Sequence, residues 1–142
     1  MARIKSILMV NNDEDLCGAI TEQFLATGEF TVHWAFCDKE ALQYLYSNDF
    51  DAIIIDTNLP SKGVPELCAI IRKQDVNCPI IMVTDDTGIS GAISGFDGSA
   101  IEYVRKPFKF SVLLAQVRSQ LRQLSQIEDV NLAFGPYLFS PA

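Results

Sequence analysis

Apolar runs of strand length alternate with segments of helical periodicity, and this alternation recurs five times along the chain. The pattern predicts strands over residues 4–10, 30–35, 52–57, 79–84 and 101–105. Helices are predicted between them: the first is stopped by Gly28, the second is capped by Asp38, and the third has Pro65 in its first turn. A last helix is expected over about residues 111–126, with no helical pattern past residue 129.

Strands that are apolar along their whole length must be covered on both faces of their sheet. Together with the intervening helices, they predict a (βα)5 fold of the α/β class, with a doubly wound, parallel, five-stranded sheet. Residues 85–100 hold four glycines, each of which disfavours a helix, so we expect the fourth helix to be short or frayed.

Polar residues stand at the C-terminal ends of four of these runs. The first apolar run ends in Asn11 and Asn12, the third in Asp56 and the fourth in Thr84, while Lys106 follows the fifth. In a parallel, doubly wound sheet these ends meet at one edge, where ligands bind. A carboxylate, a hydroxyl and an ammonium group at that edge predict a site that accepts a phosphoryl group.

Composition excludes several classes of function. The chain has a net charge of −7, which argues against direct binding of nucleic acid or of an anionic membrane. No apolar run reaches membrane-spanning length, so we expect a cytoplasmic protein without membrane contact. The four cysteines lack CxxC spacing and only one histidine, His33, is present, so they are interpreted as small apolar residues of a reducing compartment.

These residues also resemble a known family. Asp56 followed by Leu59-Pro60, Thr84, and Lys106-Pro107 three residues after Tyr103 resemble the CheY-like receiver domain of two-component response regulators, a flavodoxin-like fold. The resemblance covers roughly residues 4–125 without a gap, and the last helix resembles the OmpR/PhoB subfamily.

The resemblance implies a role for each matching residue. Asp56 is expected to be the phosphoacceptor that takes phosphate from a sensor histidine kinase. Lys106 would neutralise the phosphoryl group, Thr84 would hydrogen-bond it, and Tyr103 stands at the aromatic switch position. The expected magnesium ligands are Asn12, Asp56 and the carbonyl of Asn58.

The chain departs from the family at the acidic pair, which is replaced here by Asn11 and Asn12. Magnesium prefers anionic oxygen ligands, so its binding, and with it phosphorylation of Asp56, should be weak or absent. Without like-charged neighbours, Asp56 is expected to pair directly with Lys106. Asp85 next to Thr84 adds a negative charge near an incoming phosphate, and Asp13 is expected to point elsewhere.

Subfamily resemblance also predicts an arrangement of domains and partners. Residues 1–125 would form the receiver, and residues 126–142 a linker and the start of a truncated winged-helix domain, through which alone the protein would bind DNA. A homodimer is expected through helix four, strand five and helix five, where Asp97, Glu102 and Arg118 match the family's charged positions, while Ala92, Ile101, Val112 and Gln116 replace charged residues. The apolar replacements favour dimers that do not depend on phosphate.

We interpret the chain as a non-enzymatic receiver that controls transcription, with three alternatives left open. The first alternative is a conventional receiver, with Asp13 or Asp85 as a substitute magnesium ligand. The second is a pseudo-receiver that acts only as an interaction module. In the third, Asp56 is a structural cap and Lys106 forms a structural ion pair. A hydrolase of the haloacid dehalogenase kind is disfavoured, because that mechanism needs an aspartate where Asn58 stands.

Overall fold

The computed structural model describes residues 4–56, 64–74, 78–84 and 101–134. Its elements in chain order are β1 (Lys5–Val10), α1 (Glu14–Ala26), β2 (Phe30–Ala35), α2 (Asp38–Ser47), β3 (Ala52–Asp56), α3 (Val64–Gln74), β4 (Ile80–Thr84), β5 (Ile101–Arg105) and α5 (Phe110–Phe134). All five predicted strands are present, with ends shifted by one residue at most. The predicted fourth helix, over residues 85–100, lies outside the described residues.

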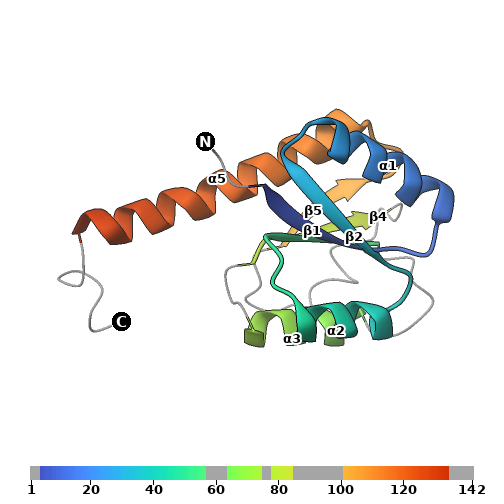
Figure 1. The fold of residues 1–142 in the computed structure, drawn as a ribbon, viewed down its shortest axis with the longest axis horizontal. Coiled ribbons are helices and arrows are strands. Elements are labelled where there is room, and N and C mark those ends of the chain that lie inside the picture. Colours follow the sequence, from blue (N-terminus) through green and yellow to red (C-terminus); the bar gives the residue numbers. More distant parts are fainter. Residues whose placement is uncertain (1–3, 57–63, 75–77, 85–100, 135–142) are drawn as a thin grey trace.

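The five strands form one parallel sheet in the order β2-β1-β3-β4-β5, which confirms the predicted doubly wound architecture. Figure 1 shows α1 and α5 on one face of the sheet and α2 and α3 on the other. In the pairing register, Val10 faces Ile55, Asp56 faces Val83, and Thr84 faces Arg105. This register brings the C-terminal ends of β1, β3, β4 and β5 to one edge.

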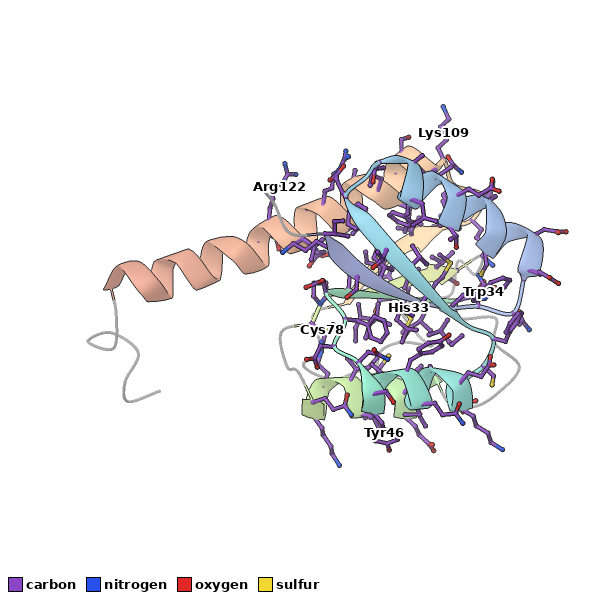
Figure 2. All side chains as sticks on the ribbon, in the orientation of Figure 1. His33, Trp34, Tyr46, Cys78, Lys109 and Arg122 are labelled. Carbon is purple, nitrogen blue, oxygen red and sulfur yellow. The ribbon has the colours of Figure 1, made fainter. Side chains whose placement is uncertain are left out.

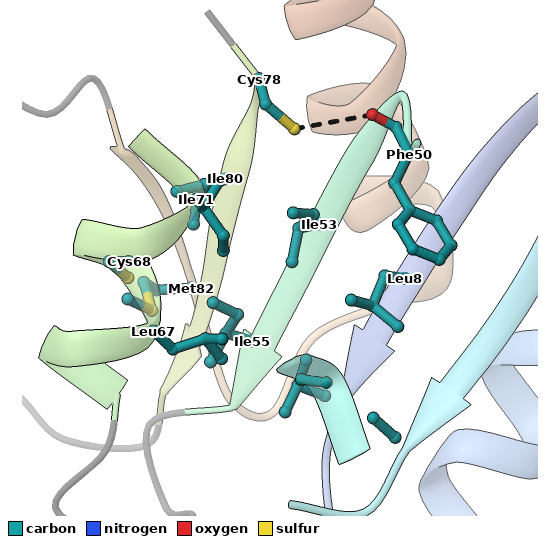
Figure 3. Close-up of a cluster of buried hydrophobic side chains, with 13 residues drawn as sticks. Leu8, Phe50, Ile53, Ile55, Leu67, Cys68, Ile71, Cys78, Ile80 and Met82 are labelled. Carbon is teal, nitrogen blue, oxygen red and sulfur yellow. Dashed lines mark hydrogen bonds between the residues drawn. The ribbon is translucent and has the colours of Figure 1, made fainter. Parts of the chain in front are cut away.

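Alternate residues of each strand belong to two separate cores, because successive side chains of a strand point to opposite faces. On one face, Phe24 of α1 and Leu113 and Val117 of α5 cover Met9, Ile54, Ile81 and Val104. On the other face, Leu67, Cys68 and Ile71 of α3 pack against Leu8, Ile53, Ile55 and Met82, as Figure 3 shows. Burial of each such aliphatic side chain contributes about 1.5–3 kcal/mol, which explains why the central strands β3 and β4 are apolar up to their last residues.

Two local predictions concern helix ends, and one of them differs from the structure. Asp38 does not cap α2: the helix begins at Asp38, and its N-cap residue is Cys37, which makes no side-chain cap. Instead, the carboxylate of Glu40, in the first turn, accepts a hydrogen bond from the amide of Phe36 at 2.6 Å. Gly28 acts as expected, since it follows α1 with a φ of +73°, where glycine is favoured.

Helix α5 is longer than predicted. It continues to Phe134, past residue 129 where the helical pattern ends, so residues 126–134 of the expected linker segment are helical. A helix of 25 residues is about 37 Å long, roughly twice the length of a strand in this sheet. Figure 1 accordingly shows the C-terminal half of α5 extending away from the sheet.

All four cysteines are free thiols, and three of them are buried: Cys17, Cys68 and Cys78. Burial, reinforced by the Asp13 and Asp56 carboxylates, raises the pKa of the Cys17 thiol to about 12. Burial also raises the pKa of Cys68 to about 11. The three buried cysteines are small residues of the hydrophobic cores, whereas Cys37 is half-buried.

His33 lies on β2, away from the C-terminal edge of β3 and β4, and packs edge-on against Tyr44 and Phe50 with ring centroids about 5.5 Å apart. Figure 2 shows it between the strand and α2. Within the described ranges, no helix is long and apolar enough to cross a membrane.

Candidate functional site

Asp56 and Lys106 form an ion pair at the C-terminal edge of the sheet. The Nζ atom of Lys106 lies 2.6 Å from Oδ2 of Asp56, so the expected direct pairing is present. The side chain of Asp56 is 3% exposed and that of Lys106 is 22% exposed. The carboxylate is therefore held inside the protein by an ammonium group that still reaches solvent.

The same carboxylate oxygen is also bound by Asn11. Nδ2 of Asn11 donates a hydrogen bond to Oδ2 of Asp56 at 3.0 Å, and the Asn11 side chain is buried. On its other side, Oδ1 of Asn11 accepts a hydrogen bond from the backbone amide of Asp13 at 2.7 Å. A carboxamide has its donor and its acceptor on separate atoms, so these two partners fix which end of the Asn11 amide faces Asp56.

The second asparagine is placed differently. Asn12, one of the three magnesium ligands expected from the sequence, is exposed. Asp13 turns away from Asp56 and caps α1, because its Oδ1 accepts a hydrogen bond from the amide of Leu16 at 3.1 Å. That geometry agrees with the prediction that Asp13 points elsewhere.

Thr84 and Tyr103 occupy neighbouring strands next to the ion pair. Thr84 ends β4 and is buried, and its carbonyl accepts a 2.7 Å hydrogen bond from the backbone amide of Lys106. The Lys106–Pro107 peptide bond is cis. Tyr103 lies on β5 at the surface, and partial burial, with Cys68 and Glu102 nearby, raises the pKa of its phenol.

Among the described residues, the groups around Asp56 do not fit a magnesium ion. The buried Asn11 presents N–H donors, not an oxygen, to the Asp56 carboxylate, and its own oxygen is already hydrogen-bonded. No group of three or more acidic, histidine or cysteine residues is placed to hold a metal among the residues that the structure describes. Two residues named by the sequence analysis, Asn58 and Asp85, lie outside them.

Part of the expected dimer surface is visible. Tyr103 of β5 and Val112 of α5 are exposed, and Glu102 is half-buried. Arg118, however, is engaged within the chain: its guanidinium binds both carboxylate oxygens of Glu29, between α1 and β2, with Nε 3.2 Å from Oε1. This hydrogen-bonded pair lowers the pKa of Glu29. Asp97 and Ala92 lie outside the described residues, as does the side chain of Ile101.

The structure thus places Asp56, Lys106 and Thr84 at the predicted edge of the sheet, and it shows a contact of Asn11 with Asp56 that was not predicted. The two adjacent asparagines were interpreted together as weakened metal ligands. The signal that separates them is the strand register, because Asn11 directly follows Val10, which pairs with Ile55 of β3. Asn11 is thus the residue level with Asp56, and Asn12 lies one position further into the loop.

Comparison with known proteins agrees with this architecture. Residues 7–118 match the family model described as "Response regulator receiver domain". The chain is 34% identical over 117 residues to Regulatory protein VanRB of Enterococcus faecalis, covering 82% of the chain and 52% of VanRB. It is 31% identical over 116 residues to Transcriptional regulatory protein TcrA of Mycobacterium tuberculosis, covering 82% of the chain and 46% of TcrA.

Solved structures give the same result. The receiver domain of the Francisella response regulator 1452 matches with a TM-score of 0.72 and 29% identity, over 84% of this chain and 98% of that one. The chain spans about half the length of the curated relatives that it matches. The family match covers most of the chain, and the sheet order and the strand-end carboxylate accompany it. The chain therefore belongs to the response regulator receiver domain family.

Proposed function

We propose that this chain is the receiver of a transcription-regulating response regulator of the OmpR/PhoB type, with a phosphoacceptor pocket that works weakly or not at all with magnesium. One observation carries the proposal: the buried Asp56 carboxylate is bound by the Lys106 ammonium group and the Asn11 amide on the same oxygen. In this arrangement the carboxylate is satisfied by the protein's own groups. Asn11 supplies a donor at a place where a cation would need an anionic ligand.

Phosphoryl transfer to Asp56, the reaction of the family, would still be possible in this pocket, but slow. A carboxylate oxygen of Asp56 would attack phosphorus, and the bond from phosphorus to the donor's leaving group would break. Lys106 would stabilise the added charge and Thr84 would hydrogen-bond the phosphoryl oxygens. A phosphoryl group arriving here meets one ammonium group and no bound dication, so less of its charge is neutralised in the transition state.

The partners follow from the same proposal. A sensor histidine kinase would supply phosphate to whatever extent Asp56 accepts it, and DNA would be bound only by a domain outside this chain. The names of the two relatives above, a regulatory protein and a transcriptional regulatory protein, support a role in transcription. The exposed Tyr103 and Val112 support a homodimer that uses β5 and α5. Because Arg118 is paired with Glu29, we expect that interface to depend on apolar contacts more than on this arginine.

The decisive experiment is intact-protein mass spectrometry after incubation with phosphoramidate, with and without magnesium, beside the Asp56→Asn variant. We expect little or no adduct on the folded wild-type chain. A full, magnesium-dependent phosphoryl adduct that Asp56→Asn abolishes would show that the pocket is conventional. No adduct under any condition would favour a pseudo-receiver whose output depends on partners or on oligomeric state.

A further inference from the structure

Asn11 forms four hydrogen bonds that join the Asp56 pocket to the edge strand β2. Its side chain donates to Asp56 and accepts from the amide of Asp13. Its backbone amide donates to the carbonyl of Ala35 at 3.0 Å. Its backbone carbonyl accepts a hydrogen bond from Nε1 of Trp34 at 2.8 Å. Every polar group of this residue therefore has a partner: its side chain binds within the pocket, and its backbone binds β2.

The Trp34 end of this network lies at the surface. Figure 2 shows Trp34 near the C-terminal end of β2, on the opposite side of the sheet from β5. Its ring lies 4.4 Å, centroid to centroid, from that of Phe36, which is 45% exposed. A change in the position of Asn11 therefore acts directly on a hydrogen bond to the only tryptophan of the chain.

An aspartate at position 11 would have the same shape but the opposite effect on Asp56. It would still accept the hydrogen bond from Asp13, but it has no N–H to donate. It would place a second carboxylate oxygen about 3 Å from Oδ2 of Asp56, where like charges repel strongly in a buried site. A divalent cation would relieve that repulsion, as it does wherever carboxylates converge on a metal.

We propose that Asn11 is the positioning residue that makes this pocket independent of a divalent cation, and that its backbone link to Trp34 reports the state of Asp56 at the β2 edge. The inference rests on the proposed function, because it concerns the same pocket. It goes further in assigning the independence to one residue: the amide of Asn11 takes the place of the cation beside Asp56, together with the ammonium group of Lys106.

The test compares two variants that each add one negative charge at adjacent positions. Asn11→Asp removes the donor to Asp56, whereas Asn12→Asp changes an exposed residue and leaves the bond between Asn11 and Asp56 in place. Each protein is titrated with magnesium chloride, with sodium chloride at matched ionic strength as the control, and no phosphoryl donor is added. Trp34 fluorescence and the thermal midpoint are recorded at every point.

We expect no saturable response in the wild-type chain. Asn11→Asp should unfold at a lower temperature without magnesium, regain stability as magnesium binds, and change its Trp34 emission over the same range. Its apparent magnesium affinity should exceed that of Asn12→Asp by about 10-fold or more, the usual weight of one well-placed group at a metal site. A merely structural role would lower stability to the same extent at all magnesium concentrations.

Several results would overturn the proposal. They are a saturable magnesium response in the wild-type chain that Asp56→Asn abolishes, equal responses of the two variants, and an Asn11→Asp chain that magnesium does not restore. The proposed function can fail separately: an adduct from phosphoramidate that forms without magnesium would show a working phosphoacceptor while leaving the role of Asn11 intact.

Discussion

Removing Lys106 should cost this protein more stability than removing Asp56, although both substitutions break the same ion pair. In Lys106→Met, the carboxyl group of Asp56 stays at a position that is only 3% exposed, while its cationic partner is gone. In Asp56→Asn, the ammonium group of Lys106 remains, but its side chain is 22% exposed and can turn its charged end towards water. The two variants therefore leave very different groups without compensation.

Breaking a buried ion pair from one side typically costs about 3–5 kcal/mol. Because Asn11 still donates to Asp56, we expect Lys106→Met to fall at the lower end, at about 3 kcal/mol. Asp56→Asn should cost about 1–2 kcal/mol, the value of the lost charge-assisted hydrogen bond. The double variant contains neither charge and should be more stable than Lys106→Met alone, which gives a favourable coupling energy in the cycle.

Urea unfolding, followed by circular dichroism, measures all four proteins in this cycle. With a slope of about 1.5–2 kcal/mol per molar urea, a loss of 3 kcal/mol lowers the midpoint by about 1.5–2 M. Lys106→Gln is a useful second variant, since it keeps a hydrogen-bond donor without the charge. If Lys106→Met were no less stable than Asp56→Asn, the charge of Asp56 would not depend on Lys106, and the electrostatic account of the pocket would be wrong.

Three further predictions test other parts of the fold. In the native protein only Cys37, which is half-exposed, should react quickly with Ellman's reagent, and Cys37→Ser should abolish this phase while leaving the three buried thiols to react on unfolding. Stability should fall as pH rises above about 8.5, because the unfolded chain releases the Cys17 proton there while the folded chain keeps it to about pH 12. Urea titrations of Cys17→Ala across that range should show a shallower decline, and an unchanged slope would contradict the assignment. Gly28→Ala should lose about 1 kcal/mol, because φ is +73° there, whereas Gly18→Ala, in the helix α1 with open space at its Cβ, should gain about 0.5 kcal/mol; equal signs would refute the backbone argument.

The fold was predictable because burial on both faces of the sheet leaves a strong mark in the sequence. The strands β3 and β4 are buried at every position, and only a parallel sheet covered by helices accommodates such runs. The convergence of Asp56, Thr84 and Lys106 was predictable for the same reason, since all three follow directly from the ends of parallel strands. These three residues lie at the same edge of the sheet although they are far apart in the sequence.

The errors arose where local sequence leaves several solutions open. At α2, Asp38 is a good capping residue, but Glu40 two positions later takes a nearby backbone amide and the helix begins at Asp38. At α5, the chain past residue 129 lacks the apolar periodicity of a packed helix, but Leu132 and Ala133 favour helix by intrinsic propensity. A continuous helix from Phe110 adds each residue at little cost once it is nucleated, whereas a lone strand has no partner to pair with.

An asparagine at position 11, where the family has an acidic residue, has two consequences, and only one of them could be seen in the sequence. It removes an anionic ligand, which was evident from the sequence, and it supplies a hydrogen-bond donor to Asp56, which required the geometry. The two effects act in the same direction: the first weakens the attraction for a cation, and the second stabilises the pocket without one. The Asp56 carboxylate is already bound by an ammonium group and an amide. A divalent cation should therefore accelerate its phosphorylation less than that of a carboxylate surrounded by other carboxylates. We therefore expect the balance between active and inactive forms of this receiver to respond less to phosphate than to changes in the bonds of Asn11, Lys106 and Trp34.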